Sequence, residues 1–224
     1  MKNNKIYSSF HLKIFDKIVI KKRLEIVDII NEQIVLNNIQ DVLDIGTTSD
    51  TENKSSNLII KNLKNVKNIS SISDQLITSP FFKKKFQKSI VQNFSEHEIE
   101  NFKSDLVVSN ATIEHVGNYK NQKAMVRNMI KLSKKMVIIS SPYRYHPIEF
   151  HTKIPFIHWL PKKIHRNILK NFNISFYSKE KNLNLLSESD FSSFIKNKEI
   201  KSEFRYIKYL FFKSNLIFIL KKYA

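Results

Sequence analysis

Cysteine is absent from the 224-residue sequence, and glycine occurs only twice. The absence of cysteine excludes disulfide bonds, thiolate metal sites and cysteine nucleophiles, and with them a disulfide-stapled secreted scaffold. No window of about 18 uncharged apolar residues occurs, so the sequence predicts no membrane-spanning helix. The basic N-terminal residues are followed by a run that charged residues interrupt, so we expect no secretory signal there.

The residues that are present indicate one globular α/β domain over residues 1–224. Apolar residues make up 42% of the chain and aromatic residues 12%, which is enough to build a core at this length. The formal net charge is +18. Lysine is spread along the chain together with asparagine and isoleucine, as on a solvated surface. The charge favours anions without naming a partner, and we expect nucleic acid not to be one.

Gly46 stands where a buried strand, predicted over residues 41–45, runs into the hydroxyl-rich turn Thr47-Thr48-Ser49. Glycine permits backbone angles and close approaches that a Cβ would prevent. A turn of this kind between a strand and a helix can present backbone N–H groups to a ligand. An ordinary strand-to-helix turn has the same sequence pattern, so both interpretations stay open.

Strands alternate with helices along the first two thirds of the chain. Apolar spacing predicts a helix over residues 17–36, with Asp16 as its N-cap. Further helices are predicted over residues 55–63, 81–86 and 120–132, and strands over residues 41–45, 66–72, 89–92, 105–109 and 136–140. This alternation predicts a parallel sheet with helices on both faces, and such sheets bind ligands beyond the carboxyl ends of their strands. Two late apolar runs, 204–212 and 216–220, predict an antiparallel hairpin.

A different pattern follows the fifth predicted strand. Four of the five prolines and the only tryptophan, Trp159, lie between residues 142 and 161. Prolines at this density prevent one continuous helix, and a long irregular segment in a compact domain is often a lid. We predict a lid insertion over residues 142–178. Its acid-free part, residues 151–170, is consistent with an anionic lipid surface as partner or with a solvated helix. Ser187 and Asp190 predict a capped helix that ends near residue 195.

Two blocks in order resemble the class I S-adenosylmethionine (SAM) dependent methyltransferases. They are Val42-Leu43-Asp44-Ile45-Gly46 and Ser104-Asp105-Leu106-Val107-Val108-Ser109-Asn110-Ala111-Thr112-Ile113-Glu114-His115-Val116. The segments 140–144 and 147–151 are similar to a subgroup with a proline- and histidine-bearing stretch after strand five. The resemblance covers about residues 20–220. It implies a Rossmann-like doubly wound, mostly parallel seven-stranded sheet with an antiparallel C-terminal hairpin, a lid after strand five and an N-terminal helical segment over residues 1–36.

The resemblance also implies which residues contact SAM. Asp44 and Gly46 would lie against its methionine part, although the usual glycine-rich loop is reduced here to Gly46. The acid that holds the ribose hydroxyls aligns best with Ser73, and we predict its neighbour Asp74 for that role. Asn93 would accept from the adenine amino group. The full predicted set is Asp44, Gly46, Thr47, Thr48, Asp74, Asn93, Phe94 (stacked on adenine), Ser109 and Asn110 (both facing the methyl group).

Methyl transfer from a sulfonium is an in-line displacement that needs mainly proximity, and a hydroxyl or carboxyl acceptor adds the need for a base. His115, Glu149 and His151 are the candidate catalytic residues. His115 could instead pack the turn after strand four, and the other two could fix the loop. The pattern His146-x-x-Glu149-x-His151 has metal-ligand residue types, but no regular element places a third histidine, so we expect no metal.

These observations predict SAM-dependent methyl transfer to a small-molecule, saccharide or lipid-linked acceptor, at oxygen. We expect a cytoplasmic protein, with peripheral membrane contact through residues 151–170 left open. The alternative is a non-catalytic methyltransferase-fold module that binds nucleic acid or anionic membrane through its basic surface. A nicotinamide-dependent enzyme is disfavoured because G-x-G-x-x-G does not follow the first strand.

Overall fold

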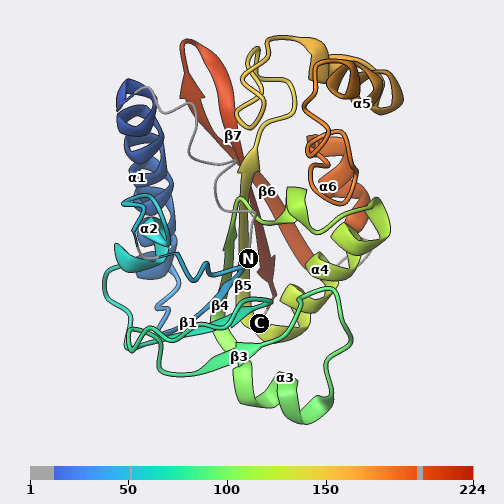
Figure 1. Cartoon of the computed structure of the whole chain (residues 1–224). Helices are drawn as coiled ribbons and strands as arrows, with labels where there is room; N and C mark the ends of the chain where they lie inside the picture. The colour runs from blue at the N-terminus through green and yellow to red at the C-terminus, as the bar shows by residue number, and fades with distance from the viewer. Residues whose placement is uncertain (1–12, 51, 196–198, 224) are drawn as a thin grey trace.

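A computed structural model describes residues 13–50, 52–195 and 199–223, and within them one sheet runs through the molecule (Figure 1). The sheet has seven strands in the order β3-β2-β1-β4-β5-β7-β6. Strands β1 to β5 are parallel, and β7 pairs antiparallel with both β5 and β6. This confirms the predicted sheet and its C-terminal hairpin. The strands are β1 Asp41–Ile45, β2 Asn68–Ser73, β3 Lys85–Gln87, β4 Ser104–Asn110, β5 Ser133–Pro142, β6 Ile200–Tyr209 and β7 Phe212–Lys222.

Helices cover both faces of the sheet. In Figure 1, α1 and α2 lie on one side, and α4 and α6 lie on the other. The α-helices are α1 Lys13–Leu36, α2 Leu58–Lys61, α3 Glu96–Phe102, α4 Tyr119–Leu132, α5 Lys162–Asn171 and α6 Glu188–Phe194, with short 3-10 helices η1 Ile113–His115 and η2 Ile157–Trp159. No helix among the described residues is long and apolar enough to cross a membrane.

Side-chain alternation along the buried strands separates two cores. Val42 of β1 packs into the core beneath α1, which includes Ile26 and Ile30. Its neighbour Leu43 faces the opposite core, together with Met125 of α4. Successive strand residues point to opposite faces, so a strand buried on both faces must be apolar throughout. This requirement explains why β1, β4 and β5 were recognisable from sequence.

The third strand departs from the prediction. It comprises Lys85–Gln87 rather than residues 89–92, and residues 81–86 are not helical. The Lys83 amide donates to the Ile69 carbonyl at 2.8 Å, and the Ser71 amide donates to the Lys84 carbonyl at 2.9 Å. The lysine run therefore belongs to a segment that pairs with β2 at the sheet edge. Lysines on an edge strand oppose pairing with another chain. The sequence prediction of a helix over residues 81–86 had placed the same lysines on a solvent-exposed helix face.

Capping boxes begin two of the helices, α6 and α3, and only the first was predicted from sequence. Ser187 and Asp190 form the predicted capping box of α6, which confirms that helix. Ser95 and Glu98 form a second capping box at α3, a helix that the sequence analysis did not predict. The predicted N-cap Asp16 is wrong, because α1 already begins at Lys13. Residues 1–12 of the predicted N-terminal segment lie outside the described residues.

The C-terminal hairpin turns earlier than expected. The turn consists of Leu210 and Phe211, which both have positive φ angles, of 47° and 69°. The predicted turn residues Lys213-Ser214-Asn215 lie inside β7, where Asn215 is opposite Ile207. Phe211 is 99% exposed. Hairpin turns with two positive φ angles usually carry asparagine or glycine, so an apolar turn such as Leu210-Phe211 cannot be recognised from its residue types.

Candidate functional site

Gly46 lies at the carboxyl end of β1, beside the end of β4, where Ile45 is paired with Ser109. Its φ angle is +88°, and its amide donates to the Ile72 carbonyl at 3.0 Å. A Cβ at this position would lie 2.3 Å from Oγ1 of Thr112. The glycine is therefore required by its backbone angle and by the protein's own threonine, a packing reason that the sequence analysis did not foresee.

Two side chains from other segments hold the turn after Gly46. Asn57 Oδ1 accepts from the Thr48 amide at 3.0 Å, and Asn57 Nδ2 donates to the Thr48 carbonyl at 2.8 Å. Gln75 Oε1 accepts from the amide and hydroxyl of Ser49 at 2.8 and 2.9 Å. The sequence analysis missed both residues, although Gln75 is next to the predicted Asp74. The turn is held in place before any ligand arrives.

A cavity of about 230 Å³ opens beside this turn, and we call it the Gly46 cavity. It is lined by Arg23, Asp44, Ile45, Gly46, Thr48, Asn53, Ser55, Ser56, Asn57, Leu58, Ile59, Ile60, Asn110, Ala111 and Thr112. The buried Asp44 carboxyl accepts from the Thr47 hydroxyl at 2.5 Å. Burial raises the pKa of Asp44 to about 6, against the opposing effect of that hydrogen bond. A cationic ligand group would stabilise the ionised carboxylate.

Two of the predicted SAM-contacting residues are buried with partners of their own. The Thr47 hydroxyl contacts the Ser71 hydroxyl at 2.6 Å in addition to Asp44. The Ser109 hydroxyl donates to the Ile45 carbonyl at 2.9 Å, across the pair of strands. Both therefore support the strand ends without lining the cavity. Asn110 does line it, and its Oδ1 accepts from the Ser140 hydroxyl at 2.6 Å.

Asp74, Asn93 and Phe94 are not among the residues that line the Gly46 cavity. Because β3 ends at Gln87, Asn93 and Phe94 do not follow the strand end directly as the prediction required. The Phe94 ring packs instead beside Phe86, and the Lys88 ammonium lies 4.8 Å from its centroid. Asp74 is exposed after β2. Their contacts with ribose and adenine stay predictions that the geometry does not support.

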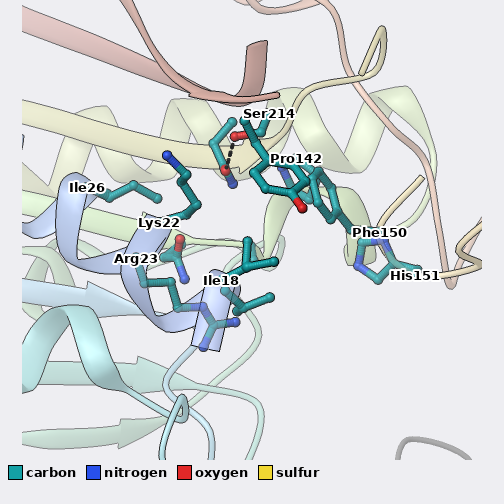
Figure 2. Close-up of a pocket in the computed structure, with 13 residues that line it drawn as sticks. Ile18, Lys22, Arg23, Ile26, Pro142, Phe150, His151 and Ser214 are labelled. Atoms are coloured by element: carbon teal, nitrogen blue, oxygen red, sulfur yellow. Dashed lines mark hydrogen bonds between the residues drawn. The ribbon is translucent and has the colours of Figure 1, made fainter. Parts of the chain in front are cut away.

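A second cavity of about 230 Å³ lies between α1, the segment after β5 and the C-terminal hairpin (Figure 2). We call it the lid cavity. It is lined by Ile18, Val19, Lys22, Arg23, Ile26, Asn110, Ala111, Pro142, Phe150, His151, Tyr209, Ser214 and Asn215. Arg23, Asn110 and Ala111 line both cavities, so the two adjoin at the end of β4. No sequence pattern singled out Arg23, on the predicted N-terminal helix, as a site residue.

The three predicted catalytic residues meet at the edge of the lid cavity. His151 Nδ1 lies 2.6 Å from the buried Glu149 Oε1, and the Thr152 amide donates to Glu149 Oε2 at 2.6 Å. Burial alone would raise the pKa of Glu149, but the His151 charge and these hydrogen bonds lower it to about 2. Burial lowers the pKa of His151. The charge and the hydrogen bond of Glu149 raise this pKa by more, so it lies above the ordinary value for histidine.

His115 comes to the same place from η1, after β4. Its Nε2 lies 3.2 Å from Nε2 of His151, and its Nδ1 lies 2.7 Å from the Asn182 carbonyl. The adjacent Glu114 is 1% exposed, and neither of its carboxylate oxygens has a hydrogen-bond partner. The Glu-His-Val block marks His115 as a candidate from its chemistry, but the burial of Glu114 is a tertiary property that the sequence does not reveal.

No protein-family model and no curated protein sequence matches the chain. Solved structures do match. Magnesium protoporphyrin IX methyltransferase from Synechocystis PCC 6803, with bound SAH, matches with a TM-score of 0.56 and 11% identity over 96% of this chain and 90% of that chain. The methyltransferase domain of a bacterial Hen1, CtHen1-C, matches with a TM-score of 0.55 and 13% identity over 92% and 100%.

An O-methyltransferase family protein from Burkholderia thailandensis matches with a TM-score of 0.54 and 12% identity, over 93% of this chain and 58% of that one. At these identities the likeness concerns the fold. The strand order and the antiparallel β7 agree with it, so the chain has the class I SAM-dependent methyltransferase fold.

Proposed function

We propose that the chain is a SAM-dependent methyltransferase that binds SAM in the Gly46 cavity and the methyl acceptor in the lid cavity. The observation that carries this proposal is that the two cavities adjoin at Arg23, Asn110 and Ala111. A donor and an acceptor held on either side of that junction are close enough for an in-line displacement, in which proximity supplies most of the rate. Bound SAM would supply a methyl group on a sulfonium.

The Gly46 cavity offers groups that suit the methionine part of SAM. Asp44 presents a buried carboxylate that gains from a cationic partner such as an α-ammonium group. Thr48 and Asn57, which belong to the held turn and to the side chain that fixes it, contribute polar atoms to the lining of the cavity. Gln75 supports that turn from behind and replaces Asp74 as the residue after β2 that we connect with the cofactor.

The lid cavity suits a small polar acceptor. Its volume of about 230 Å³ equals that of the Gly46 cavity, so each cavity takes the reacting part of its ligand: the methionine part of SAM in one and the accepting group in the other. Tyr209, Ser214 and Asn215 add polar atoms to a wall that also contains aliphatic, aromatic and basic side chains. We infer an oxygen acceptor on a small molecule, a saccharide or a lipid-linked intermediate, because His151 lines the cavity and, with its neighbour His115, forms a polar group at the place where a hydroxyl must lose its proton.

Exposed apolar side chains beside the lid cavity support a peripheral membrane contact. Residues 151–170 expose Phe156, Trp159, Leu160 and Ile164. The hairpin turn exposes Leu210 and Phe211, and Figure 1 shows the tip of this hairpin at the same end of the molecule as α5. Lysines and apolar groups on one surface are typical of proteins that bind at an anionic lipid interface.

Trp159 is the only tryptophan, so its fluorescence reports this contact directly. We expect a blue shift with vesicles that contain anionic phospholipid and none with zwitterionic vesicles. Phe156→Ser should weaken vesicle binding about tenfold, because it removes one large apolar side chain from the interface. An unchanged Trp159 spectrum with anionic vesicles would remove the membrane contact and leave methyl transfer untouched.

Isothermal titration with SAM and with S-adenosylhomocysteine tests the main proposal. We expect saturable binding of one molecule of each per chain. Asp44→Asn should weaken it at least about 100-fold, whereas the matched control Asp28→Asn, at an exposed position of α1, should bind like the wild type. Binding of neither compound to folded protein would overturn the proposed function.

A further inference from the structure

The two facing imidazoles have fixed hydrogen-bond roles. The Asn182 carbonyl can only accept, so His115 Nδ1 carries a proton, and its Nε2 is left with a lone pair in the neutral ring. His151 Nδ1 donates in the same way to the Glu149 carboxylate. The two Nε2 atoms then present lone pairs to each other at 3.2 Å. With both rings neutral this contact is repulsive, and either a proton on one Nε2 or a metal ion bound by both nitrogens relieves it.

Glu114 supplies a second, independent observation that points to a cation ligand. Its Oε1 lies 3.8 Å from His115 Nε2. A carboxylate that is 1% exposed and has no hydrogen-bond partner carries a large desolvation cost unless a charge compensates it. Arg23 is electrostatically coupled to Glu114, but its guanidinium donates to the Ser55 carbonyl, and Glu114 receives no hydrogen bond from it.

We propose that the Glu114 carboxylate and Nε2 of His115 and His151 bind one divalent transition-metal ion. The ligand atoms of these residues all lie within 4.8 Å of one another. Ligand atoms at about 2.0–2.1 Å from a tetrahedral zinc ion are about 3.4 Å apart. The observed separations of 3.2 and 3.8 Å lie on either side of that value. Two imidazoles with one carboxylate suit Zn²⁺, Co²⁺, Mn²⁺ or Fe²⁺.

The surroundings have the form of an outer ligand shell. Glu149 and the Asn182 carbonyl each hold the Nδ1–H of one ligating histidine, which fixes the ring so that Nε2 faces the ion. From sequence, His146, Glu149 and His151 formed the candidate set, and no metal was expected because no regular element places a third histidine. In the structure, His146 Nδ1 is engaged by the backbone of Ile148, and the second histidine comes from η1 instead.

The role of the ion rests on the proposed function. Three protein ligands leave a coordination position open, and His151 lines the lid cavity where the acceptor is proposed to bind. An ion there would hold the acceptor oxygen and lower the pKa of its hydroxyl, so that the proton leaves to solvent. The oxygen then forms the bond to the methyl carbon while the carbon–sulfur bond breaks and its electron pair stays on sulfur.

Titration of the metal-free full-length chain with Co²⁺ tests the site without any methyl donor. We expect one Co²⁺ per chain, with visible absorption bands from a nitrogen- and oxygen-ligated ion. Glu114→Gln and His151→Ala should each weaken binding at least about 100-fold. The matched control His97→Ala removes an exposed histidine of α3 and should change nothing. Glu149→Gln should weaken binding about 10–100-fold through the outer shell.

Wild-type protein that binds no Co²⁺ stoichiometrically overturns the inference, as does equal binding by wild type, Glu114→Gln and His151→Ala. Circular dichroism of each metal-free variant verifies folding, and the wild-type stoichiometry decides even where a variant fails to fold. SAM titration on the same preparations keeps the two proposals apart. If the protein binds SAM but not Co²⁺, only the proposed metal site is overturned. If it binds Co²⁺ but not SAM, only the proposed methyltransferase function is overturned.

Discussion

The Gly46 cavity and the lid cavity have the same volume, about 230 Å³, but they are built differently. The Gly46 cavity lies on the ends of paired strands, where Asp44 is in register with Val108 and Ser71. The lid cavity is assembled from α1, the segment after β5 and the hairpin, which are far apart in the sequence. Sheet topology therefore dictates the donor side, and long-range packing dictates the acceptor side.

The largest effect is expected from a substitution in the turn that forms the Gly46 cavity. Gly46→Val places a side chain on Thr112 and forces a β-branched residue to a φ angle of +88°. We expect a loss of about 2–5 kcal/mol of unfolding free energy, from overpacking and backbone strain together. Urea unfolding measures it. Gly46→Ala with Thr112→Ala should recover part of the stability, and a cost below about 0.5 kcal/mol for Gly46→Ala alone would contradict the packing account.

Replacing Asp44 by asparagine should weaken SAM binding but stabilise the folded protein at neutral pH. Asp44→Asn should weaken SAM binding at least about 100-fold, because the buried carboxylate is lost. The folded-state pKa of about 6 lies above the ordinary value of 3.8, so ionisation of Asp44 destabilises the fold increasingly between about pH 4 and pH 6. At pH 7.5 the variant should therefore be more stable, by no more than about 3 kcal/mol.

Chemical denaturation of wild type and Asp44→Asn at pH 4 and pH 7.5 measures this difference. Asp28→Asn serves as the matched control, since its side chain is exposed on α1. A variant that binds SAM normally, or one that gains no stability at pH 7.5, would contradict the assigned role of the carboxylate.

The same group should make SAM binding depend on pH. Below about pH 6 the ionised fraction of Asp44 falls about tenfold per pH unit, and the dissociation constant for SAM should rise in proportion. Above pH 6 we expect little change from this residue. Titrations at half-unit intervals measure the profile, and a wild-type profile that is flat between pH 5 and pH 7 would argue against Asp44 as the partner of a cationic group.

The smallest expected effects separate two neighbours after β2. Gln75→Ala removes the acceptor that holds the Ser49 amide and hydroxyl, so SAM binding should weaken about three- to tenfold. Asp74→Ala should change it less than about twofold, because Asp74 does not line the Gly46 cavity. The reverse order of effects in a SAM titration would restore the ribose contact that the sequence predicted for Asp74.

Sequence reasoning succeeded where burial imposes a continuous pattern. The strands at Asp41–Ile45, Ser104–Asn110 and Ser133–Pro142 are buried on both faces, so their apolar runs could be recognised. It failed at Lys85–Gln87, because a three-residue edge strand with exposed lysines has no such pattern. Because the third strand was predicted at residues 89–92, Asn93 and Phe94 were wrongly expected directly after a strand end.

The residues of the Gly46 cavity and those of the histidine cluster could be predicted to different extents. Asp44, Gly46, Thr48 and Asn110 lie at or just after the carboxyl ends of strands, and they line one cavity as sheet topology requires. His115, Glu149 and His151 were selected for their chemistry and meet in space. Their partner Glu114 was missed, since nothing local distinguishes a buried, unpartnered glutamate from an exposed one.

The measurement that tests the account most directly is a crystal structure of the protein with S-adenosylhomocysteine. The account predicts that the ligand fills the Gly46 cavity, with its amino group toward Asp44 and its sulfur toward the junction at Asn110 and Ala111. Density for the ligand elsewhere, or an empty Gly46 cavity in crystals grown at saturating ligand, would contradict it.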